Sequence, residues 1–540
     1  ANSTGTTNVA VGSSALLANT TGTDNVAVGA LALDANTTAS QNTAVGRNAL
    51  TANTTGHSGI AIGAYALNAN TTGNYNLAIG RDTMVSNTTG TRNSAVGSNS
   101  LDANTTGSHN IAFGYAALTA NTTASYNIAI GDSAMGANTT GTQNIAIGQD
   151  ALATMSTSSY NTGVGYQALK VNTGQENAAF GTDSLLANTS GGRNTGLGAY
   201  SLNANTTAND NTGVGYLTLY ATTTGVDNTA VGAKALKTAT TATRNTAVGM
   251  DSLQACTTGS YNTGIGQRAL YASTTGTENV AMGYLAMDAN TTGSYNVGLG
   301  VNALGANTTA NYNTAVGIGA MIANTTGHSN VAIGATAGDG ITTGVENTIV
   351  GYLAGDNITT ESYNIMIGHG TTAGNSNNHC IVIGHDISID GNFFAFGKSG
   401  NYVYNGFTSN ASWTRSSDER LKKNISTSTL GLDFINALRP VTFNWKDSRE
   451  IDSSDSELTD HYNADENLMD STTTLHGFVA QEVKTAMDNA GVSNFGGWNK
   501  LSTGVEGVSL EAMVTPLVKA LQEADDKIDA LTTRVAALES

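Results

Sequence analysis

Residues 42–58 read Asn42-Thr43-Ala44-Val45-Gly46-Arg47-Asn48-Ala49-Leu50-Thr51-Ala52-Asn53-Thr54-Thr55-Gly56-His57-Ser58 and form one copy of a unit that fills most of this chain. The unit is N-x-(A/G)-φ-G followed by x-x-A-L-x-A-N-T-T-(G/A)-x-x, where φ is apolar. Its closing glycine occurs 23 times, mostly 17 residues apart, with 16-residue steps before Gly181 and Gly384. So regular a period is typical of a repeat architecture.

The residues that precede the closing glycine alternate as in a β-strand. The residue directly before the glycine, such as Val45 or Ile62, is always apolar, so we predict that it is buried. The residue before that is nearly always Ala or Gly, as at Ala44, which predicts a close approach here, for example by another chain. Leu50, in the second half of the unit, is expected to be a second buried apolar side chain. We call this position of the unit the plug. The A-N-T-T-G run is expected to turn with Asn and Gly in left-handed backbone, while Thr hydroxyls satisfy turn amides.

Units of this length are too short to bury a core alone, so successive units must stack. With coils about 4.8 Å apart, the stack would be a rod on the order of 110 Å long. The asparagines that open the strands would then bond to one another along the stack, as in ladder structures; they include Asn8, Asn25, Asn42, Asn76, Asn93 and Asn110. We therefore predict a parallel β-solenoid or β-roll over residues 1–384, in a mostly β chain.

Composition and charge exclude several classes of protein. The net charge of −18 argues against nucleic acid as a partner. Cys256 and Cys380 are too far apart for a disulfide framework or metal-ligand spacing, and we expect no metal and no cofactor. No apolar run approaches the roughly 18–20 residues that span a bilayer, so we expect no membrane insertion. The sequence opens inside a repeat, which leads us to expect an N-terminal anchoring part outside it.

Two other interpretations of the repeats are less favoured. A calcium-binding β-roll needs an acidic residue at a fixed phase, and no position of the unit is regularly Asp or Glu. The N-T-T triplets match the N-glycosylation acceptor pattern, but turn and ladder chemistry explains their phase better.

The strand segments Asn110-Ile111-Ala112-Phe113-Gly114 and Asn144-Ile145-Ala146-Ile147-Gly148 resemble the N-S-V-A-I-G repeats of YadA-like trimeric adhesin heads. The resemblance implies three chains that form left-handed rolls around a threefold axis, and hence a homotrimer. The 17-residue unit of this chain is longer than the usual unit of that family.

The pattern changes after Gly334. Glycine or threonine replaces the plug leucine, and the small position becomes Ile349, Met366 and Val382. We therefore predict that the rod widens or ends here. Residues 385–416 are expected to leave the repeat and to form an aromatic-rich neck, either an interchain core that caps the solenoid or a tip that contacts a receptor. Its aromatic residues are Phe393, Phe394, Phe396, Tyr402, Tyr404, Phe407 and Trp413.

Residues 417–540 have a different composition, and they predict a small α+β domain. We expect a helix over 430–438 that ends at Arg439-Pro440, a strand over 441–445, an exposed acidic loop over 447–475, a strand over 477–480 and a helix to about residue 489. An apolar seam with heptad spacing then predicts a coiled coil over 509–540. Its residues are Leu510, Val514, Leu517, Leu521, Ala524, Ile528, Leu531, Val535 and Leu538, with Pro516 near the start.

A second resemblance covers this domain. Its motifs are Ser417-Asp418-Glu419-Arg420-Leu421-Lys422-Lys423-Asn424-Ile425, Gly431-Leu432-Asp433-Phe434, Pro440-Val441 and His476-Gly477-Phe478-Val479-Ala480-Gln481-Glu482-Val483. With the terminal heptads, they are similar to the endosialidase-type intramolecular chaperone domain that ends many phage tail fibres and tailspikes. The resemblance implies that the domain helps three chains to assemble and then cuts itself off between Ser416 and Ser417.

The resemblance also implies roles for single residues. Ser417 would be the nucleophile and Lys422 its base, because a serine hydroxyl needs a base near neutral pH and burial would disfavour the lysine ammonium. Asp418 and Arg420 would fix the turn. His476 would orient or share protons, with Gln481 in support. Without the resemblance, a Ser and a Lys five residues apart are a weak signal, and the residues alone favour an ordinary exposed loop.

Together these patterns predict a homotrimeric fibre, most simply a phage tail fibre on the virion that recognises a host cell-surface glycan or protein receptor. The fold would be a parallel β-solenoid shaft, then a chaperone domain with a trimeric coiled coil, and self-cleavage would be the one reaction. A bacterial surface adhesin or other extracellular fibre is an alternative. A polysaccharide-degrading tailspike would use paired carboxylates, which the repeats lack, and an ice- or mineral-binding rod would use the Thr residues that recur in register.

Overall fold

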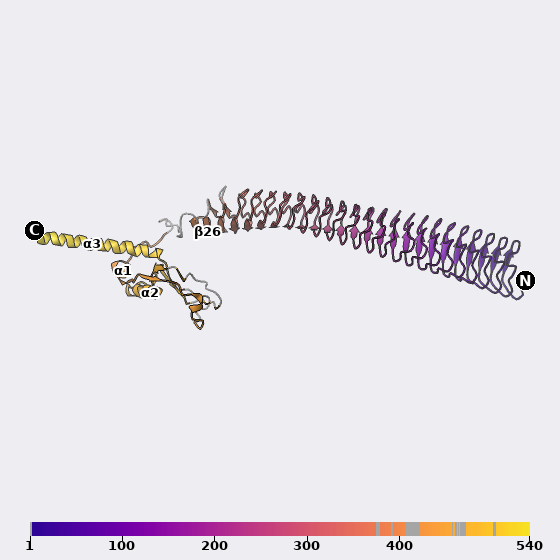
Figure 1. Cartoon of the computed structure of the whole chain (residues 1–540), viewed down its shortest axis with the longest axis horizontal. Helices are drawn as coiled ribbons and strands as arrows, with labels where there is room; N and C mark the ends of the chain where they lie inside the picture. The colour runs from indigo at the N-terminus through magenta and orange to yellow at the C-terminus, as the bar shows by residue number, and fades with distance from the viewer. Residues whose placement is uncertain are drawn as a thin grey trace. The chain divides into compact units, whose positions relative to one another are not determined.

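The computed structural model describes residues 3–373, 378–389, 393–406, 419, 422–455, 457–458, 462, 464, 471–472, 474–500 and 504–540. The chain divides into two compact units, Ala1–Ser416 and Ser417–Ser540. Figure 1 shows the first unit as a row of stacked coils and the second as short strands with three helices.

The first unit is a solenoid in which each repeat supplies one short strand of a parallel sheet, as predicted. Each strand pairs with the next in strict register, for example Ala44 with Ala61. The strands of the repeats are β1 (Val9–Val11), β2 (Val26–Val28), β3 (Thr43–Val45), β4 (Ile60–Ile62), β5 (Leu77–Ile79), β6 (Ser94–Val96), β7 (Ile111–Phe113), β8 (Ile128–Ile130), β9 (Ile145–Ile147), β10 (Thr162–Val164), β11 (Ala178–Phe180), β12 (Thr195–Leu197), β13 (Thr212–Val214), β14 (Thr229–Val231), β15 (Thr246–Val248), β16 (Thr263–Ile265), β17 (Val280–Met282), β18 (Val297–Leu299), β19 (Thr314–Val316), β20 (Val331–Ile333), β21 (Thr348–Val350), β22 (Ile365–Ile367) and β24 (Ile381–His385).

The two faces of these strands are the reverse of the prediction. Ala44 and its equivalents from Ala27 onward are buried, whereas the apolar residues before the glycines point outward and are partly or largely exposed, as at Ile62 and Phe113. The group that approaches the small residue is the plug of the same chain. A Cβ added at Gly196 would lie 2.5 Å from Ser184 Oγ and 3.5 Å from the Leu185 side chain, both in the plug segment of the same chain. The alanine column therefore makes room for the plug leucines, which are buried as predicted.

The turns also differ from the prediction. In the A-N-T-T-G run, neither Asn53 nor Gly56 has left-handed backbone; the plug Leu50 does, with φ 54°. A leucine in this conformation is strained by roughly 1–2 kcal/mol, and burial of its side chain, worth about 1.5–3 kcal/mol, offsets that cost. The Thr54 hydroxyl donates to the carbonyl of Thr71 in the next coil, 3.1 Å away, rather than satisfying a turn amide.

The predicted asparagine ladder is confirmed. The amide of Asn110 donates to Asn93 Oδ1 at 3.2 Å and to the Ala124 carbonyl at 2.9 Å. A second ladder, which the sequence did not lead us to expect, runs through the asparagines of the A-N-T-T runs. There Asn53 donates to Asn36 Oδ1 at 3.0 Å. Both columns are buried, so each coil is tied to the next by side chains as well as by backbone.

The prediction that the shaft widens or ends after Gly334 is wrong. Strands β21, β22 and β24 continue in the same parallel register, and Ile349, Met366 and Val382 are fully buried. The core keeps its volume because large and small residues exchange places. A Cβ at the plug position Gly355 would lie 2.8 Å from Ile349 Cδ1, so the isoleucine fills the space that a plug leucine fills upstream.

This exchange predicts a coupling between the two positions. Gly355→Ala should destabilise the coil strongly, but much less when Ile349→Ala has removed the atoms that its Cβ would meet. The strain of alanine at the positive φ of Gly355 is common to both backgrounds, so it cancels in a double-mutant cycle. We expect a coupling energy of about 1–2 kcal/mol, measured as local opening free energy by hydrogen exchange. If the free-energy changes of Gly355→Ala and Ile349→Ala were strictly additive, the exchange of large and small residues between these positions would be contradicted.

The repeat also runs further than predicted. In β26 (Phe393–Lys398), Ala395 lies opposite Val382 and Gly397 opposite Gly384, and Ala395 is fully buried. The segment Phe394–Gly397 thus repeats the apolar-small-apolar-glycine pattern, so the prediction that 385–416 leaves the repeat is wrong here. β27 (Asn401–Gly406) pairs antiparallel with β26 and ends the sheet, and β23 (Thr372–Ala373) pairs with β25 (Ser388–Ile389). Phe407 and Trp413 lie outside the described residues.

The second unit is a small α+β domain. Its helices are α1 (Leu432–Ala437), α2 (Ala480–Asn489) and α3 (Val514–Glu539), with short 3-10 helices η2 (Ser448–Glu450) and η4 (Glu511–Met513). β28 (Val441–Phe443) pairs antiparallel with β29 (Leu475–Gly477), and β30 (Trp498–Lys500) with β31 (Glu506–Val508). The predicted helices and the first strand are present, the strand expected at 477–480 lies earlier, and Ser448 in the expected exposed loop is buried. The β30–β31 hairpin was not predicted.

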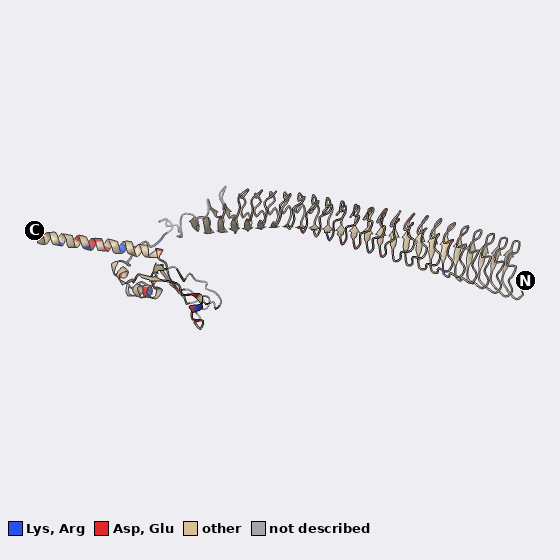
Figure 2. Cartoon of the chain, viewed as in Figure 1, with Lys and Arg blue, Asp and Glu red and all other residues tan. Residues whose placement is uncertain are grey.

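Apolar side chains from α1, α2 and η4 meet in the core of this unit. Phe434 of α1, Val483 and Met487 of α2, and Met513 beside α3 are buried together. Glu523 of α3 accepts a hydrogen bond from the Leu432 amide at 2.8 Å, which ties the start of α1 to α3. Charged residues are sparse on the coils and concentrated in the second unit (Figure 2).

Candidate functional site

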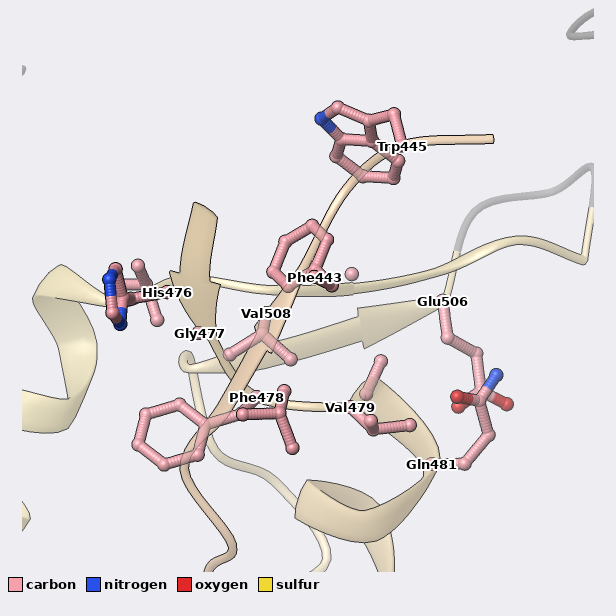
Figure 3. A pocket seen from close by; sticks show the side chains of 13 residues that line it. Phe443, Trp445, His476, Gly477, Phe478, Val479, Gln481, Glu506 and Val508 are labelled. Atoms are coloured by element: carbon pink, nitrogen blue, oxygen red, sulfur yellow. The ribbon is translucent and has the colours of Figure 1, made fainter. Parts of the chain in front are cut away.

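A hollow of the second unit opens between its two small sheets. It has a volume of 490 Å³ and is lined by Phe443 of β28, His476 of β29, the first residues of α2 and Val508 of β31. Figure 3 shows Phe443, Val479 and Val508 around its middle, with Trp445 above them. The ring of Trp445 meets that of Phe443 edge-on at 5.4 Å. The hollow is therefore mainly an apolar groove with polar groups at its ends.

An ion pair links two elements that line the groove, and a hydrogen bond links two helices of the same unit. Arg439, just before β28, makes a two-pronged pair with Glu482 of α2, with Nε–Oε2 at 3.1 Å and Nη2–Oε1 at 2.5 Å. Hydrogen bonding to Arg439 lowers the pKa of the Glu482 carboxyl below its usual range. The Leu432 amide likewise lowers the pKa of Glu523. Both carboxylates are thus charged at neutral pH. Glu482 connects α2 to the start of β28, and Glu523 connects α3 to the start of α1.

The structure brings only part of the predicted catalytic set into one place. His476 and Gln481 both line the groove, but at opposite ends of it in Figure 3. Lys422 is exposed and is not one of the lining residues; its backbone N–H donates to the Glu419 carbonyl at 2.9 Å. Ser416, Ser417, Asp418 and Arg420 lie outside the described residues, so the distances from the predicted nucleophile to Lys422 and His476 are not part of the described geometry.

Sequence reasoning missed the far wall of the groove. Glu506 of β31 lies beside Gln481 in Figure 3, and its carboxylate accepts a hydrogen bond from Trp498 Nε1 at 3.3 Å. Trp498 also lies beneath the ammonium of Lys484, 5.3 Å from the ring centre. The one sequence signal for this wall was a tryptophan in a short polar stretch before the heptads, which does not by itself predict a hairpin.

The helix α3 carries the predicted heptad seam on an uncovered face. Only Pro516 and Ala520 of the helix are buried, whereas the seam side chains from Val514 onward are exposed, Leu521 to 73% and Leu538 to 80%. Leu510 was predicted as the first seam residue but lies before η4, so the seam on the helix begins at Val514. Pro516 falls in the first turn, where its missing N–H costs nothing. Among the described residues, no helix combines the length and hydropathy needed to cross a bilayer.

Part of the second unit matches a known protein family. A family model, Peptidase S74, described as the chaperone of endosialidase, matches residues 417–492. This range begins at the serine predicted to be the nucleophile and ends just after α2, so it contains His476, Gln481 and the Arg439–Glu482 pair. No curated protein matches the chain. A C-terminal chaperone-of-endosialidase domain together with a long β-solenoid fits a protein of the tail-fibre or tailspike type.

Proposed function

We propose that three copies of this chain form a fibre in which the solenoid is the shaft and residues 417–540 trimerise and guide the folding of the three chains. The observation that carries the proposal is the exposed seam of α3, which lies in the same unit as the chaperone match. Its residues from Val514 to Leu538 repeat at heptad spacing, and such a seam is stable only when other helices cover it.

The outward face of the shaft supports the same proposal. The residue before each closing glycine is apolar in every coil and partly or largely exposed in the single chain, for example Phe180 and Leu197. Monomeric proteins rarely expose a continuous apolar column of this length. Packing of three shafts along these columns would remove it from water.

The chaperone role follows from the sameness of the coils. Neighbouring coils are nearly identical, so strands of a nascent shaft could pair in many registers with similar energy. Parallel stacking is also slow and exposes apolar surface while it proceeds. A dissimilar domain that first aligns the three C-termini would define one register for all three chains.

The setting that we propose is a phage tail fibre that contacts a host cell-surface glycan or protein. The shaft presents exposed aromatic rings in the position directly before the strand asparagines, as at Tyr75, Tyr126 and Tyr312. Tyr295 and Tyr312 stack with ring centres 5.1 Å apart. Exposed aromatic faces of this kind suit sugar rings, and a bacterial surface fibre would use them in the same way.

The solution mass of the intact chain tests the assembly. Light scattering coupled to size exclusion should give three times the 54.8 kDa of one chain. A single-chain mass at micromolar concentration would contradict the proposal.

Self-cleavage is a separate part of the proposal, based on the family match at Ser417. The wild-type chain should yield a C-terminal piece that begins at Ser417, and Ser417→Ala should abolish it, because alanine has no nucleophilic oxygen. Denaturing gels with mass spectrometry of the new N-terminus measure both outcomes. Ser428→Ala, a hydroxyl change in the same unit, is the matched control and should cleave normally. A Ser417→Ala chain that still separates into two pieces would refute the assignment.

A further inference from the structure

Three potential metal ligands meet near the C-terminal end of the shaft, although the sequence led us to expect no metal. They are His369, His385 and Asp386, and their ligand atoms all lie within 4.8 Å of one another. His369 follows the closing glycine Gly368, and His385 follows the next closing glycine, Gly384. The solenoid period therefore stacks the two histidines, which are 16 residues apart in sequence.

The carboxylate of Asp386 lies beside both imidazoles. One of its oxygens is 2.6 Å from His369 Nδ1, and the other is 3.2 Å from His385 Nδ1. The backbone N–H of Asp386 donates to the His369 carbonyl at 2.8 Å, which fixes the aspartate above the neighbouring coil. A Cβ at Gly370 would collide with this carboxylate, so the glycine leaves the space that Asp386 occupies. Each of the three groups is thus held near the others by the fold.

We propose that His369, His385 and Asp386 bind one divalent transition-metal ion of the zinc class. Imidazole nitrogen with one carboxylate oxygen is a donor set that Zn²⁺ favours. Bonds of about 2.0–2.1 Å at tetrahedral angles place ligand atoms about 3.3–3.4 Å apart. The separation of 3.2 Å between His385 Nδ1 and one Asp386 oxygen is close to this value. His369 Nδ1 lies 2.6 Å from the other oxygen, so its imidazole must reorient to share an ion with the first.

The surroundings allow this adjustment. The two rings stack with centres 4.8 Å apart and planes 12° apart, so they must rotate to direct their nitrogens at one ion. All three side chains are exposed, which permits the rotation and leaves water to complete the coordination. Lys398 lies opposite His385 in the β24–β26 register. It is the nearest cation in that register, and its exposed, flexible side chain can move away from the ion.

The location suggests what the ion would do. The buried asparagine ladder ends at Asn364, because Cys380 occupies the equivalent position in the next coil and has no amide to donate. The backbone N–H of Cys380 donates to Asn364 Oδ1 at 2.8 Å. A metal held by His369 from one coil and by His385 and Asp386 from the next would connect these coils where the ladder stops.

Zinc titration of the full chain tests the proposal. Isothermal titration with zinc chloride should show one high-affinity ion per chain, and His369→Gln or Asp386→Asn should weaken binding by at least about tenfold. His379→Gln is the matched control, because His379 belongs to the same part of the shaft but stacks on Tyr363, outside the cluster. Zinc should also raise the melting temperature of the wild-type and control chains, and EDTA should reverse the rise.

Two results would overturn the proposal. One is a wild-type chain that binds no zinc at micromolar concentration. The other is a His369→Gln/Asp386→Asn double variant that binds zinc as tightly as the wild type, which would place the ion elsewhere. Circular dichroism checks that each variant is folded. Because the three side chains are exposed, their substitution should leave the fold intact.

Discussion

The double substitution Ile528→Asp/Leu531→Asp is expected to eliminate the trimer. Both side chains are exposed on α3 of the single chain and form two successive layers of the heptad seam. If three helices bury them, each contributes roughly 1.5–3 kcal/mol per chain, or roughly 9–18 kcal/mol per trimer for the pair. Six carboxylates in the seam would also repel one another. No stable coiled coil of this length should survive the change.

Light scattering after size exclusion measures the result. The variant should lose the three-chain species, and the yield of soluble, protease-resistant shaft should fall with it if residues 417–540 guide folding. Thr533→Asp introduces the same charge on the same helix away from the seam and should leave the trimer intact. A double variant that remains trimeric would show that the shaft faces alone hold the chains together, and would remove the seam from the proposal.

The substitution Gly249→Ala is expected to break the shaft at one coil. Gly249 has φ 130°, and an added Cβ would lie 2.6 Å from the carbonyl carbon and oxygen of Gly266 in the next coil. Real Cβ atoms do not approach backbone so closely, so the two coils must move apart and lose hydrogen bonds. With backbone strain of about 1–3 kcal/mol, we expect a total cost above about 3 kcal/mol at this coil.

Limited proteolysis and hydrogen exchange locate the break. Because each coil contacts only its neighbours, amides near residues 232–266 should lose protection while distant coils keep theirs. Gly136→Ala is the matched control: its Cβ would have no neighbour closer than 3.3 Å, and Ala153 already occupies the same phase one coil later. Equal protection in the Gly249→Ala and wild-type shafts would refute the claim that the closing glycines set the coil spacing.

The two units have different kinds of stabilising contacts, which suits them to different roles in assembly. The coils stack through contacts that most units repeat, namely the glycine column, two asparagine ladders and the plug leucines. None of these contacts distinguishes one coil from the next. The domain that matches the chaperone family has a core that occurs once in the chain, around Phe434 and Met487. It can therefore supply the alignment that the repeats lack.

Within the candidate site, the sequence anticipated which residues belong to the domain but not how they are arranged. His476 and Gln481 were expected together from their motif, and both line the groove. Trp498 and Glu506, which close its other side, come from a hairpin without a strong periodic signal. The His369–His385–Asp386 cluster was missed for another reason. Its sequence spacing is not that of a common metal-binding motif, and the three residues come together only because one coil of the solenoid separates His369 from His385.

The sequence by itself determined that the chain is a stack of equal coils, because an unbroken period of glycines, asparagines and leucines admits no other regular fold. It also determined that a different domain follows, with heptads at its end. Only the tertiary structure decided which side of each strand faces the core. Alternation shows that Ala44 and Val45 point to opposite faces, but either face could be inside. The interior is narrow and already holds Leu50, so it accepts only the alanine, and the larger valine faces outward. The limited space also explains Ile349. Its larger side chain fits in the core because the plug position of that coil is Gly355, which has no side chain.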